Sequence, residues 1–280
     1  MGGFFTKKHE DFKDQPTTGE IMGTVNPAFS ELTFEGKIPS VSFSTLSNFT
    51  NCPYSVYLSK VKNGGIGNVG SPAMDRGSEI HQMLEDYVKG DVEFVDWYKI
   101  KSKDYYIDMI EKFREEYKEN LIVPEMEIAL REDLSPCGWT DKDVWFRGAI
   151  DIARFNKPLE EATEATLYDY KTGGYNHSAK HRSQLQLYAL LILQLYPKIE
   201  KVSVAAIYLD HRKELFFNSF GQSDVRMIWP RTYAKLKSVT DATVFYPNAN
   251  GYTCKWCQHK TKQEKLGQDA PACEFAHVPY

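Results

Sequence analysis

The chain has 280 residues, of which 42% are hydrophobic and 26% are charged. This composition is typical of a globular protein and excludes collagen, coiled coil and global disorder. The 38 acidic and 34 basic residues give a net charge of -4, which weighs against a protein that coats nucleic acid by charge alone but not against an enzyme whose carboxylates bind metal ions.

Export and membrane signals are not evident in the sequence. The longest apolar stretch, Leu187 to Leu193, is shorter than the ~20 residues that a helix needs to cross a bilayer. The N-terminal sequence MGGFFTKKHEDFKD lacks the long apolar core of a signal peptide. We therefore expect an intracellular, cytoplasmic protein that does not bind membranes.

The first part of the chain is an arm followed by helices. Residues 1–40 are rich in Gly, Pro, Thr and charged residues and have no apolar period, which indicates a poorly structured arm. Residues 42–58 have a helical pattern with Ser44 as a candidate N-cap, but Pro53 interrupts it, so the segment is either two short helices or one bent helix. Apolar residues at spacings of three and four predict further helices over 74–88 and 103–119.

The pattern then changes from helical to extended. It predicts strands over 127–131, 144–155 and 165–171, a helix over 181–195, strands over 202–209 and 213–220, and a helix over 222–240. This order predicts an α/β (α+β) protein with a mixed central β-sheet flanked by helices. We expect one domain over 41–280, made of a helical part (41–120), a core (121–240) and a cysteine-bearing segment (241–280).

Two of the predicted strands carry acidic side chains. Asp151 ends the sequence Gly-Ala-Ile-Asp, and Asp169 and Lys171 belong to Asp-Tyr-Lys-Thr-Gly at the end of the next strand. Alternate residues of a strand share a face, so Asp169 and Lys171 project together, and Asp151 can approach Asp169 if the strands pair. A surface ion pair would explain Asp169 and Lys171 alone. Two carboxylates and a lysine beside an apolar sheet instead favour a Mg²⁺ or Mn²⁺ site that activates water.

This pattern resembles the catalytic core of the PD-(D/E)xK nuclease superfamily, in the RecB-like branch that includes CRISPR-associated iron–sulfur exonucleases. Further short motifs match that branch in the same order along the chain. The five motifs are Ser42-Phe-Ser-Thr-Leu with Cys52-Pro53-Tyr54, Gly77-Ser-Glu-Ile-His81, Gly148-Ala-Ile-Asp151, Asp169-Tyr-Lys171-Thr-Gly and Gln184-Leu-Gln-Leu-Tyr188. The resemblance implies a restriction-endonuclease-like fold with an N-terminal helical region and a cysteine-bearing C-terminal segment.

The resemblance also implies roles for individual residues. Lys171 would be the catalytic lysine, and a further catalytic acid belongs on the preceding strand, where Glu127 is our choice and Glu125 the alternative. Gln184 and Tyr188 would line the DNA path or brace the site. The implied metal ligands are His81, Asp151, Asp169 and the backbone carbonyl of Tyr170.

Basic residues accompany the acidic motif. Lys180 and Arg182 flank the start of the predicted helix after the lysine strand and could hold phosphates of DNA. A solvated loop before a helix would have the same composition, so the sequence leaves both interpretations open.

The cysteines form a second candidate metal site. Cys254 and Cys257 form a C-x-x-C pair that can grip one metal centre from a tight turn, and Cys273 follows 16 residues later. The resemblance adds Cys52 as the fourth ligand of a [4Fe–4S] cluster, although the family usually has its last cysteine much nearer to the pair. Zinc, with His259 or His277 as a ligand, and the absence of any metal are the alternatives, and Cys137 is left over.

The sequence therefore leads to one hypothesis and two rivals. The hypothesis is a Mg²⁺- or Mn²⁺-dependent DNA exonuclease acting on ends or single strands in recombination, repair or replication-linked end processing. Other recombination or replication proteins are its candidate partners, and a phage or prokaryotic source fits a compact nuclease of this kind. The rivals are a CRISPR spacer-acquisition nuclease and a catalytically silent DNA-binding module of the same fold, against which the complete set of Asp151, Asp169 and Lys171 argues.

Overall fold

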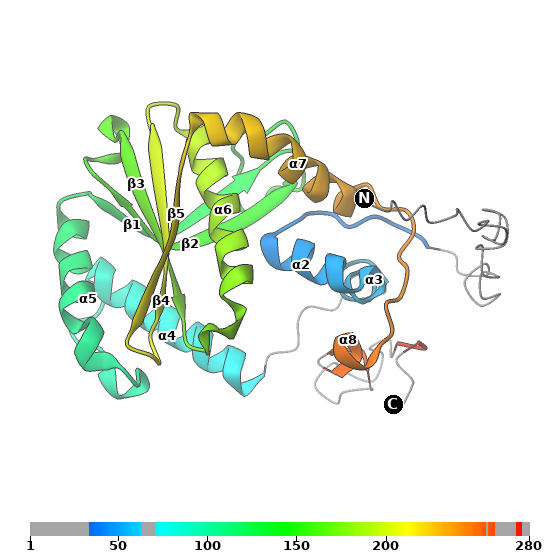
Figure 1. Ribbon diagram of the computed structural model, residues 1–280, viewed down its shortest axis with the longest axis horizontal. Helices are drawn as coiled ribbons and strands as arrows, with labels where there is room; N and C mark the ends of the chain where they lie inside the picture. The colour runs from blue at the N-terminus through cyan, green and yellow to red at the C-terminus, as the bar shows by residue number, and fades with distance from the viewer. Residues whose placement is uncertain (1–33, 63–70, 256, 261–272, 276–280) are drawn as a thin grey trace, which may run out of the picture. The chain divides into compact units, whose positions relative to one another are not determined.

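A computed structural model describes residues 34–62, 71–255, 257–260 and 273–275 of the chain (Figure 1). The chain divides into two compact units, residues 1–34 and 35–280, and the structure described below belongs to the second. Most of the expected arm over 1–40, and His277, lie outside the described residues. No helix in the described ranges is long and apolar enough to cross a membrane.

The helices and strands follow the order that the sequence predicts. The helices are α2 (Phe43–Asn51), α3 (Pro53–Lys60), α4 (Pro72–Lys89), α5 (Lys103–Lys118), α6 (Ser178–Leu195), α7 (Gln222–Thr240) and α8 (Gly251–Lys255). The strands are β1 (Ile122–Leu130), β2 (Phe146–Phe155), β3 (Glu164–Lys171), β4 (Lys201–Tyr208) and β5 (Lys213–Gly221). The short helix α8 and the earlier start of β1 are the main differences, because five residues give too little apolar periodicity to detect and Pro124 obscures the strand.

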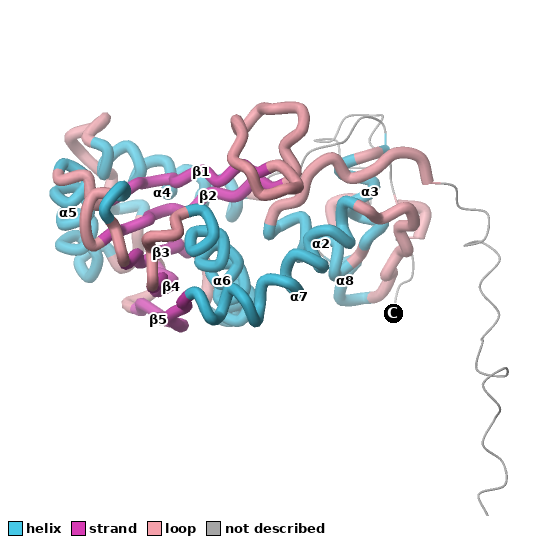
Figure 2. The backbone as a smooth tube through the Cα atoms, turned by 90° about the horizontal axis from the view of Figure 1, so that it is seen from above, coloured by secondary structure: helices cyan, strands magenta, loops and turns pink. Residues whose placement is uncertain are grey.

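The strands form one mixed sheet with the order β1-β2-β3-β4-β5 (Figures 1 and 2). The pairs β1–β2, β2–β3 and β4–β5 are antiparallel, whereas β3 and β4 are parallel. Parallel neighbours need a crossover connection, and α6 supplies it between β3 and β4. The expectation of a mixed central sheet flanked by helices is confirmed.

Helices cover both faces of the sheet (Figure 1). On one face α4 and α5 pack on the strands and enclose an apolar cluster, while α6 covers the other face and contacts α7. Ile80 and Leu84 of α4 and Tyr106 and Ile110 of α5 are fully buried in that cluster, as the helical spacing predicts. Ile152 of β2 and Tyr170 of β3 belong to this cluster, and α6 contacts β3 from the other face.

The N-terminal helices form a separate layer beside the sheet. The segment over 42–58 is two helices, because α2 ends and α3 begins at Cys52, whose extended backbone precedes Pro53. Ser42 caps α2 by accepting a hydrogen bond from the Thr45 backbone N–H. The C-terminal segment packs on these helices, since the Tyr54 N–H donates to the Tyr246 carbonyl.

Candidate active site

The candidate site lies where strands β2 and β3 stop pairing. Their antiparallel ladder ends with Ile152 opposite Tyr168, so Asp151 and Asp169 occupy the next positions along the two strands. Instead of a hydrogen bond between the two backbones, the Tyr170 N–H donates a hydrogen bond to Asp151 Oδ2 at 2.5 Å. The Asp151 carboxylate thus holds the end of β3, and the two aspartates meet as the sequence predicts.

Asp169 and Lys171 share one side of β3. Lys171 Nζ lies 2.6 Å from Asp169 Oδ2, and Asp169 is only 5% exposed. Burial raises the pKa of Asp169 to about 6, opposed by the Lys171 ammonium and reinforced by the Asp151 carboxylate. Tyr170, between them, joins the apolar cluster under α4 and α5. Burial therefore makes the Asp169 carboxyl a weaker acid than a solvent-exposed aspartate.

His81 of α4 completes the polar centre. Its Nδ1 lies 3.3 Å from Asp151 Oδ1. Burial acts to lower the pKa of His81, but the Asp151 carboxylate outweighs it and the net direction is upward. Burial alone would raise the pKa of Asp151, yet the charges of His81 and Lys171 bring it below its usual value. Three elements, α4, β2 and β3, therefore contribute charges that interact directly.

The third acidic residue of the centre is Glu125 rather than Glu127 by its position on β1. In the β1–β2 register Pro124 faces Ile152 and Met126 faces Ile150, which puts Glu125 opposite Asp151, whereas Glu127 pairs with Ala149 and is exposed. Burial, and then the Asp151 carboxylate, raise the pKa of Glu125. Its φ of 44° lies in the left-handed region, which costs a residue with a Cβ about 1 kcal/mol or more. The strained, half-buried residue of the pair is thus the one beside the aspartates.

Gly148 and Tyr188 fit together across the site. A Cβ on Gly148 would lie 2.7 Å from Tyr188 Cε1, so β2 and α6 reach this separation only because residue 148 has no side chain. Tyr188 is 5% exposed, and burial raises its pKa to about 12, with a smaller upward contribution from Asp169. Gln184, one turn earlier on α6, interacts with its hydroxyl. This packing brings the motif that contains Gly148 into contact with the motif that contains Tyr188.

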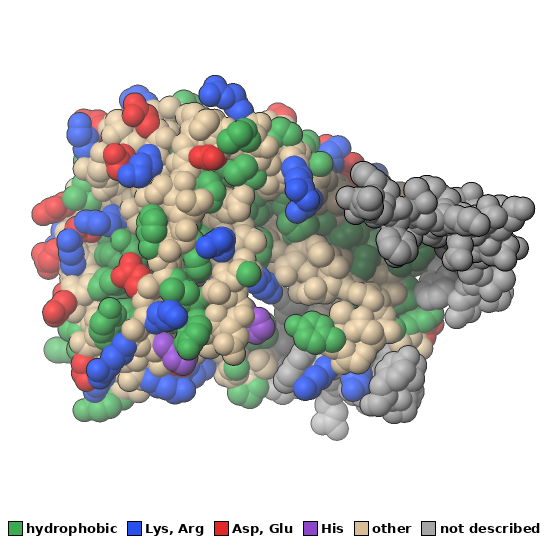
Figure 3. Space-filling view, viewed as in Figure 1, with side chains coloured by type: hydrophobic (Ala, Val, Ile, Leu, Met, Phe, Trp, Pro, Cys, Tyr) green, Lys and Arg blue, Asp and Glu red, His purple; other side chains and the backbone are tan. Residues whose placement is uncertain are grey.

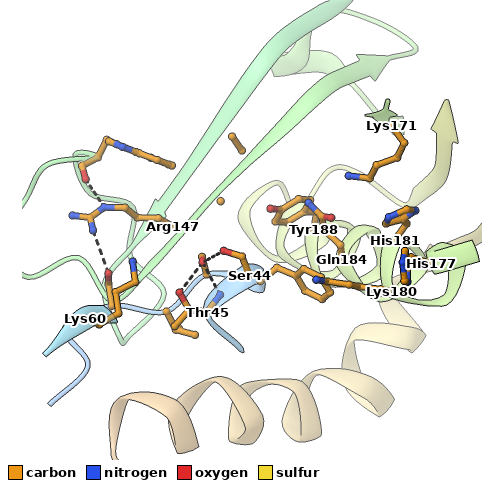
Figure 4. A pocket seen from close by; sticks show the side chains of 17 residues that line it. Ser44, Thr45, Lys60, Arg147, Lys171, His177, Lys180, His181, Gln184 and Tyr188 are labelled. Carbon is orange, nitrogen blue, oxygen red and sulfur yellow. Dashed lines mark hydrogen bonds between the residues drawn. The ribbon is translucent and has the colours of Figure 1, made fainter. Parts of the chain in front are cut away.

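A cavity of about 630 Å³ opens beside these residues (Figure 4). Lys171 and the first turns of α6 form one side, and the start of α2 and Arg147 of β2 form the other (Figure 4). Lys180, Gln184 and Tyr188 line it, but Arg182 does not: its guanidinium lies 5.7 Å over the Phe217 ring. Lys, Arg and His side chains gather around the N-terminal end of α6, beside a hollow (Figure 3).

The donor atoms suit a hard divalent cation, although they are not arranged as a cage. Asp169 Oδ2 is buried, lies against the Lys171 ammonium, and shares the centre with the Asp151 carboxylate and the His81 imidazole. Carboxylate oxygens are the ligands that Mg²⁺ and Mn²⁺ prefer. Within the described ranges no group of three or more His, Cys, Asp or Glu side chains has the geometry of a bound metal ion. Side-chain movement would therefore accompany binding.

Four of the five cysteines line a second cavity, of about 710 Å³. Cys52 comes from the α2–α3 junction, Cys254 and Cys257 from α8 and the residues after it, and Cys273 from the C-terminal segment. Burial raises the pKa of Cys273 to about 11, and the other three thiols add to that shift, so the four groups interact. Cys137 is not part of this lining.

Comparison with known proteins identifies the family. The model of the PD-(D/E)XK nuclease superfamily matches residues 40–261. The chain belongs to this superfamily. The protein is therefore a nuclease with a restriction-endonuclease-like PD-(D/E)XK fold, and nucleases of this superfamily generally use divalent metal ions. Its membership agrees with the order of the motifs found in the sequence.

Similarities to individual proteins are weaker than the family match. A crystal structure of the protein SSO0001 has 18% identity and a TM-score of 0.38, with 82% of this chain and 88% of that chain covered. A protein named "Putative exonuclease" from Eubacterium rectale has 11% identity and a TM-score of 0.45, with 84% and 91% covered. No curated protein matches the chain.

Several residues that line the cavity beside the candidate site were not singled out by the sequence. Lys60 and Arg147 line the cavity from α3 and β2, and the α2 N-terminus contributes Ser42 and Ser44. Alternate residues of a strand share a face, so Arg147 lies on the same face of β2 as Ala149, which also lines the cavity. This alternation could have indicated the position of Arg147. Nothing in the sequence around Lys60 points to the cavity, because only the packing of α3 beside the sheet brings it there.

Proposed function

We propose that the protein is a Mg²⁺- or Mn²⁺-dependent DNA exonuclease. The observation that carries this proposal is the meeting of Asp151, Asp169, Lys171 and His81 beside the 630 Å³ cavity. The superfamily supports hydrolysis of phosphodiester bonds. The preference for DNA ends, and a role in recombination, repair or replication-linked end processing, are supported by the resemblance to the RecB-like branch.

The residues that would hold the metal are His81, Asp151, Asp169, Glu125 and the backbone carbonyl of Tyr170. We choose Glu125 over Glu127 because it lies opposite Asp151 and interacts with its charge. A divalent ion bound there would lower the pKa of its water ligand and neutralise charge on the phosphate. Lys171 would leave its ion pair with Asp169 to hold the attacking water or a phosphate oxygen, which its three N–H donors allow. Lys180 and Gln184 would contact the DNA backbone at the cavity wall.

The test is digestion of end-labelled single- and double-stranded oligonucleotides with Mg²⁺, Mn²⁺ or EDTA, together with a circular single strand. We expect loss of nucleotides from an end, no cleavage of the circle and no cleavage in EDTA. Asp151→Asn and Lys171→Ala should each lower the rate about 100-fold or more, because each removes a charge that acts on the reacting phosphate. Lys142→Ala, at an exposed position, is the matched control. Cleavage that persists in both site variants would reject this site.

Glu125 and Glu127 provide a matched pair of variants that tests which residue is the third acid of the site. Both belong to β1, but Glu125 lies opposite Asp151 and interacts with its charge, whereas Glu127 pairs with Ala149 and is exposed. Glu125→Gln should lower metal-dependent cleavage by about 10-fold or more, since it removes one negative ligand, whereas Glu127→Gln should retain the wild-type rate. The reverse result would restore Glu127 as the catalytic acid.

We also propose that Cys52, Cys254, Cys257 and Cys273 bind a [4Fe–4S] cluster. Support comes from their common cavity and from the resemblance, because such clusters take four thiolates. Anaerobically purified protein should be brown and contain about four iron atoms per chain. Cys273→Ser should lose the visible absorption, while Cys137→Ser, outside the cavity, should keep it. A colourless protein that contains zinc would reject the cluster.

A further inference from the structure

His181, in the first turn of α6, is a cavity residue that the proposed reaction has not yet used. Its ring lines the 630 Å³ cavity and lies beside Lys171 in Figure 4. Its Nδ1 is 2.8 Å from the hydroxyl of Tyr208, on β4. Tyr208 in turn pairs with Lys171 in the parallel β3–β4 ladder. The ring is therefore attached to the same part of the sheet that carries the lysine.

The Tyr208 hydroxyl determines which ring nitrogen of His181 carries the hydrogen. Tyr208 is 0% exposed, and burial, with Asp169, raises its pKa, so the phenol keeps its proton. Among the described residues its hydroxyl has one hydrogen-bond partner, His181 Nδ1. If Nδ1 were the donor, the buried phenolic hydrogen would have no acceptor, which is costly. Tyr208 therefore donates to Nδ1, and the neutral ring has its hydrogen on Nε2.

The other nitrogen is available to a ligand. Within the described part of the chain, His181 Nε2 makes no hydrogen bond. It is not a buried atom, so it is accessible from the cavity. The charges that face the ring are those of Lys171, His177 and Lys180, and all of them disfavour a second proton. Burial disfavours the protonated ring even more than these charges do, and together they lower the pKa of His181 to about 4. The ring is a neutral donor at neutral pH.

We propose that His181 donates its Nε2–H to a non-bridging oxygen of the scissile phosphodiester, in the tautomer that Tyr208 imposes. The inference rests on the proposed nuclease function and adds a residue to it. A neutral imidazole can stabilise negative charge on an oxygen through a hydrogen bond without transferring its proton. Such a bond strengthens as charge grows on the phosphate in the transition state, so it should increase the cleavage rate more than the affinity for DNA.

The tautomer can be measured without any activity. Long-range ¹H–¹⁵N NMR of the wild-type protein in EDTA should show His181 as the neutral Nε2–H form at pH 7. Tyr208→Phe should give a mixture of tautomers, because the group that fixes Nδ1 as the acceptor is gone. A protonated ring, or a hydrogen on Nδ1, in the wild-type protein would overturn the inference whether or not the protein cleaves DNA.

Single-turnover cleavage of a labelled oligonucleotide with Mn²⁺ tests the role. His181→Ala should lower the rate by about 10- to 100-fold with DNA affinity within about 2-fold, as expected for one hydrogen bond to a charged group. His181→Gln, whose amide can donate from a similar position, should recover most of the rate, and thermal unfolding identifies a variant that fails to fold. The control is His211→Ala, outside the cavity lining.

The outcomes separate the two proposals. No metal-dependent cleavage by the wild-type protein would reject the nuclease function and this role with it. Wild-type cleavage with an equally active His181→Ala variant would reject only the role of His181. A large loss of DNA affinity in His181→Ala, or a Gln variant no better than Ala, would also overturn the inference, because it requires a donor that acts in the transition state.

Discussion

The contact between Gly148 and Tyr188 gives a sharp test of how the two motifs assemble. In Gly148→Ala the new methyl group would lie 2.7 Å from Tyr188 Cε1, 3.2 Å from Tyr188 Cζ and 3.2 Å from Phe146 Cε1. Phe146 is fully buried and Tyr188 is 5% exposed, so neither ring can move away without disturbing its packing. Overpacking of this kind costs about 1–3 kcal/mol. For a chain of this size, each kcal/mol lowers Tm by about 2–4 °C.

Thermal unfolding followed by circular dichroism in EDTA would measure this cost. We expect Gly148→Ala to lower Tm by about 6 °C, taking ~2 kcal/mol as the central value. Gly174→Ala is the matched control, because a Cβ there meets nothing within 4 Å and its φ of -68° suits alanine. In a Tyr188→Leu background, which removes the clashing ring atoms, the added methyl should cost less than about 0.5 kcal/mol. Equal losses in both backgrounds would refute the proposed contact.

Three further predictions concern charges and buried hydrogen bonds. The pKa of Asp169 in the folded protein is raised to about 6, so its contribution to stability is present below its unfolded pKa and is lost as pH rises through the folded pKa. Urea titrations in EDTA should therefore show the free energy of unfolding of the wild type falling by ~3 kcal/mol relative to that of Asp169→Asn between about pH 4 and pH 7. Arg76→Ala should cost ~3 kcal/mol in the same assay, because it leaves the nearly buried Asp210 without its two guanidinium hydrogen bonds, and Arg76→Lys should cost less. Tyr106→Phe should cost about 1–3 kcal/mol in thermal unfolding, since its fully buried hydroxyl bonds three backbone groups, and an unchanged Tm would contradict this.

Local patterns predicted the elements well because their cause is local. The buried positions Ile80 and Leu84 recur at the helical spacing of α4, and β3 alternates between the apolar cluster and the site through Tyr170 and Asp169. The pairing of Asp151 with the end of β3 also followed, since adjacent antiparallel strands bring such residues together.

The choice between Glu125 and Glu127 could not be made in the same way. Both positions lie on one face of β1, so the period of two treats them alike. What separates them is the register with β2 and the positive φ of Glu125, which are set by the pairing of two strands and not by either sequence. The position of Lys60 in the cavity wall could not be predicted either, because it depends on how α3 packs beside the sheet.

The two cavities share a wall, which connects the cysteine segment to the candidate active site. Thr45, Lys60 and Lys180 line both of them. Helix α3 is fixed to the cysteine segment, where Ser59 Oγ lies 2.8 Å from His259 Nε2. A cofactor that held the four thiols together would therefore also fix the position of Lys60 at the nuclease cavity. Loss of that cofactor should displace Lys60 at the cavity wall before it disturbs the Asp151 and Lys171 centre, because that centre rests on the sheet.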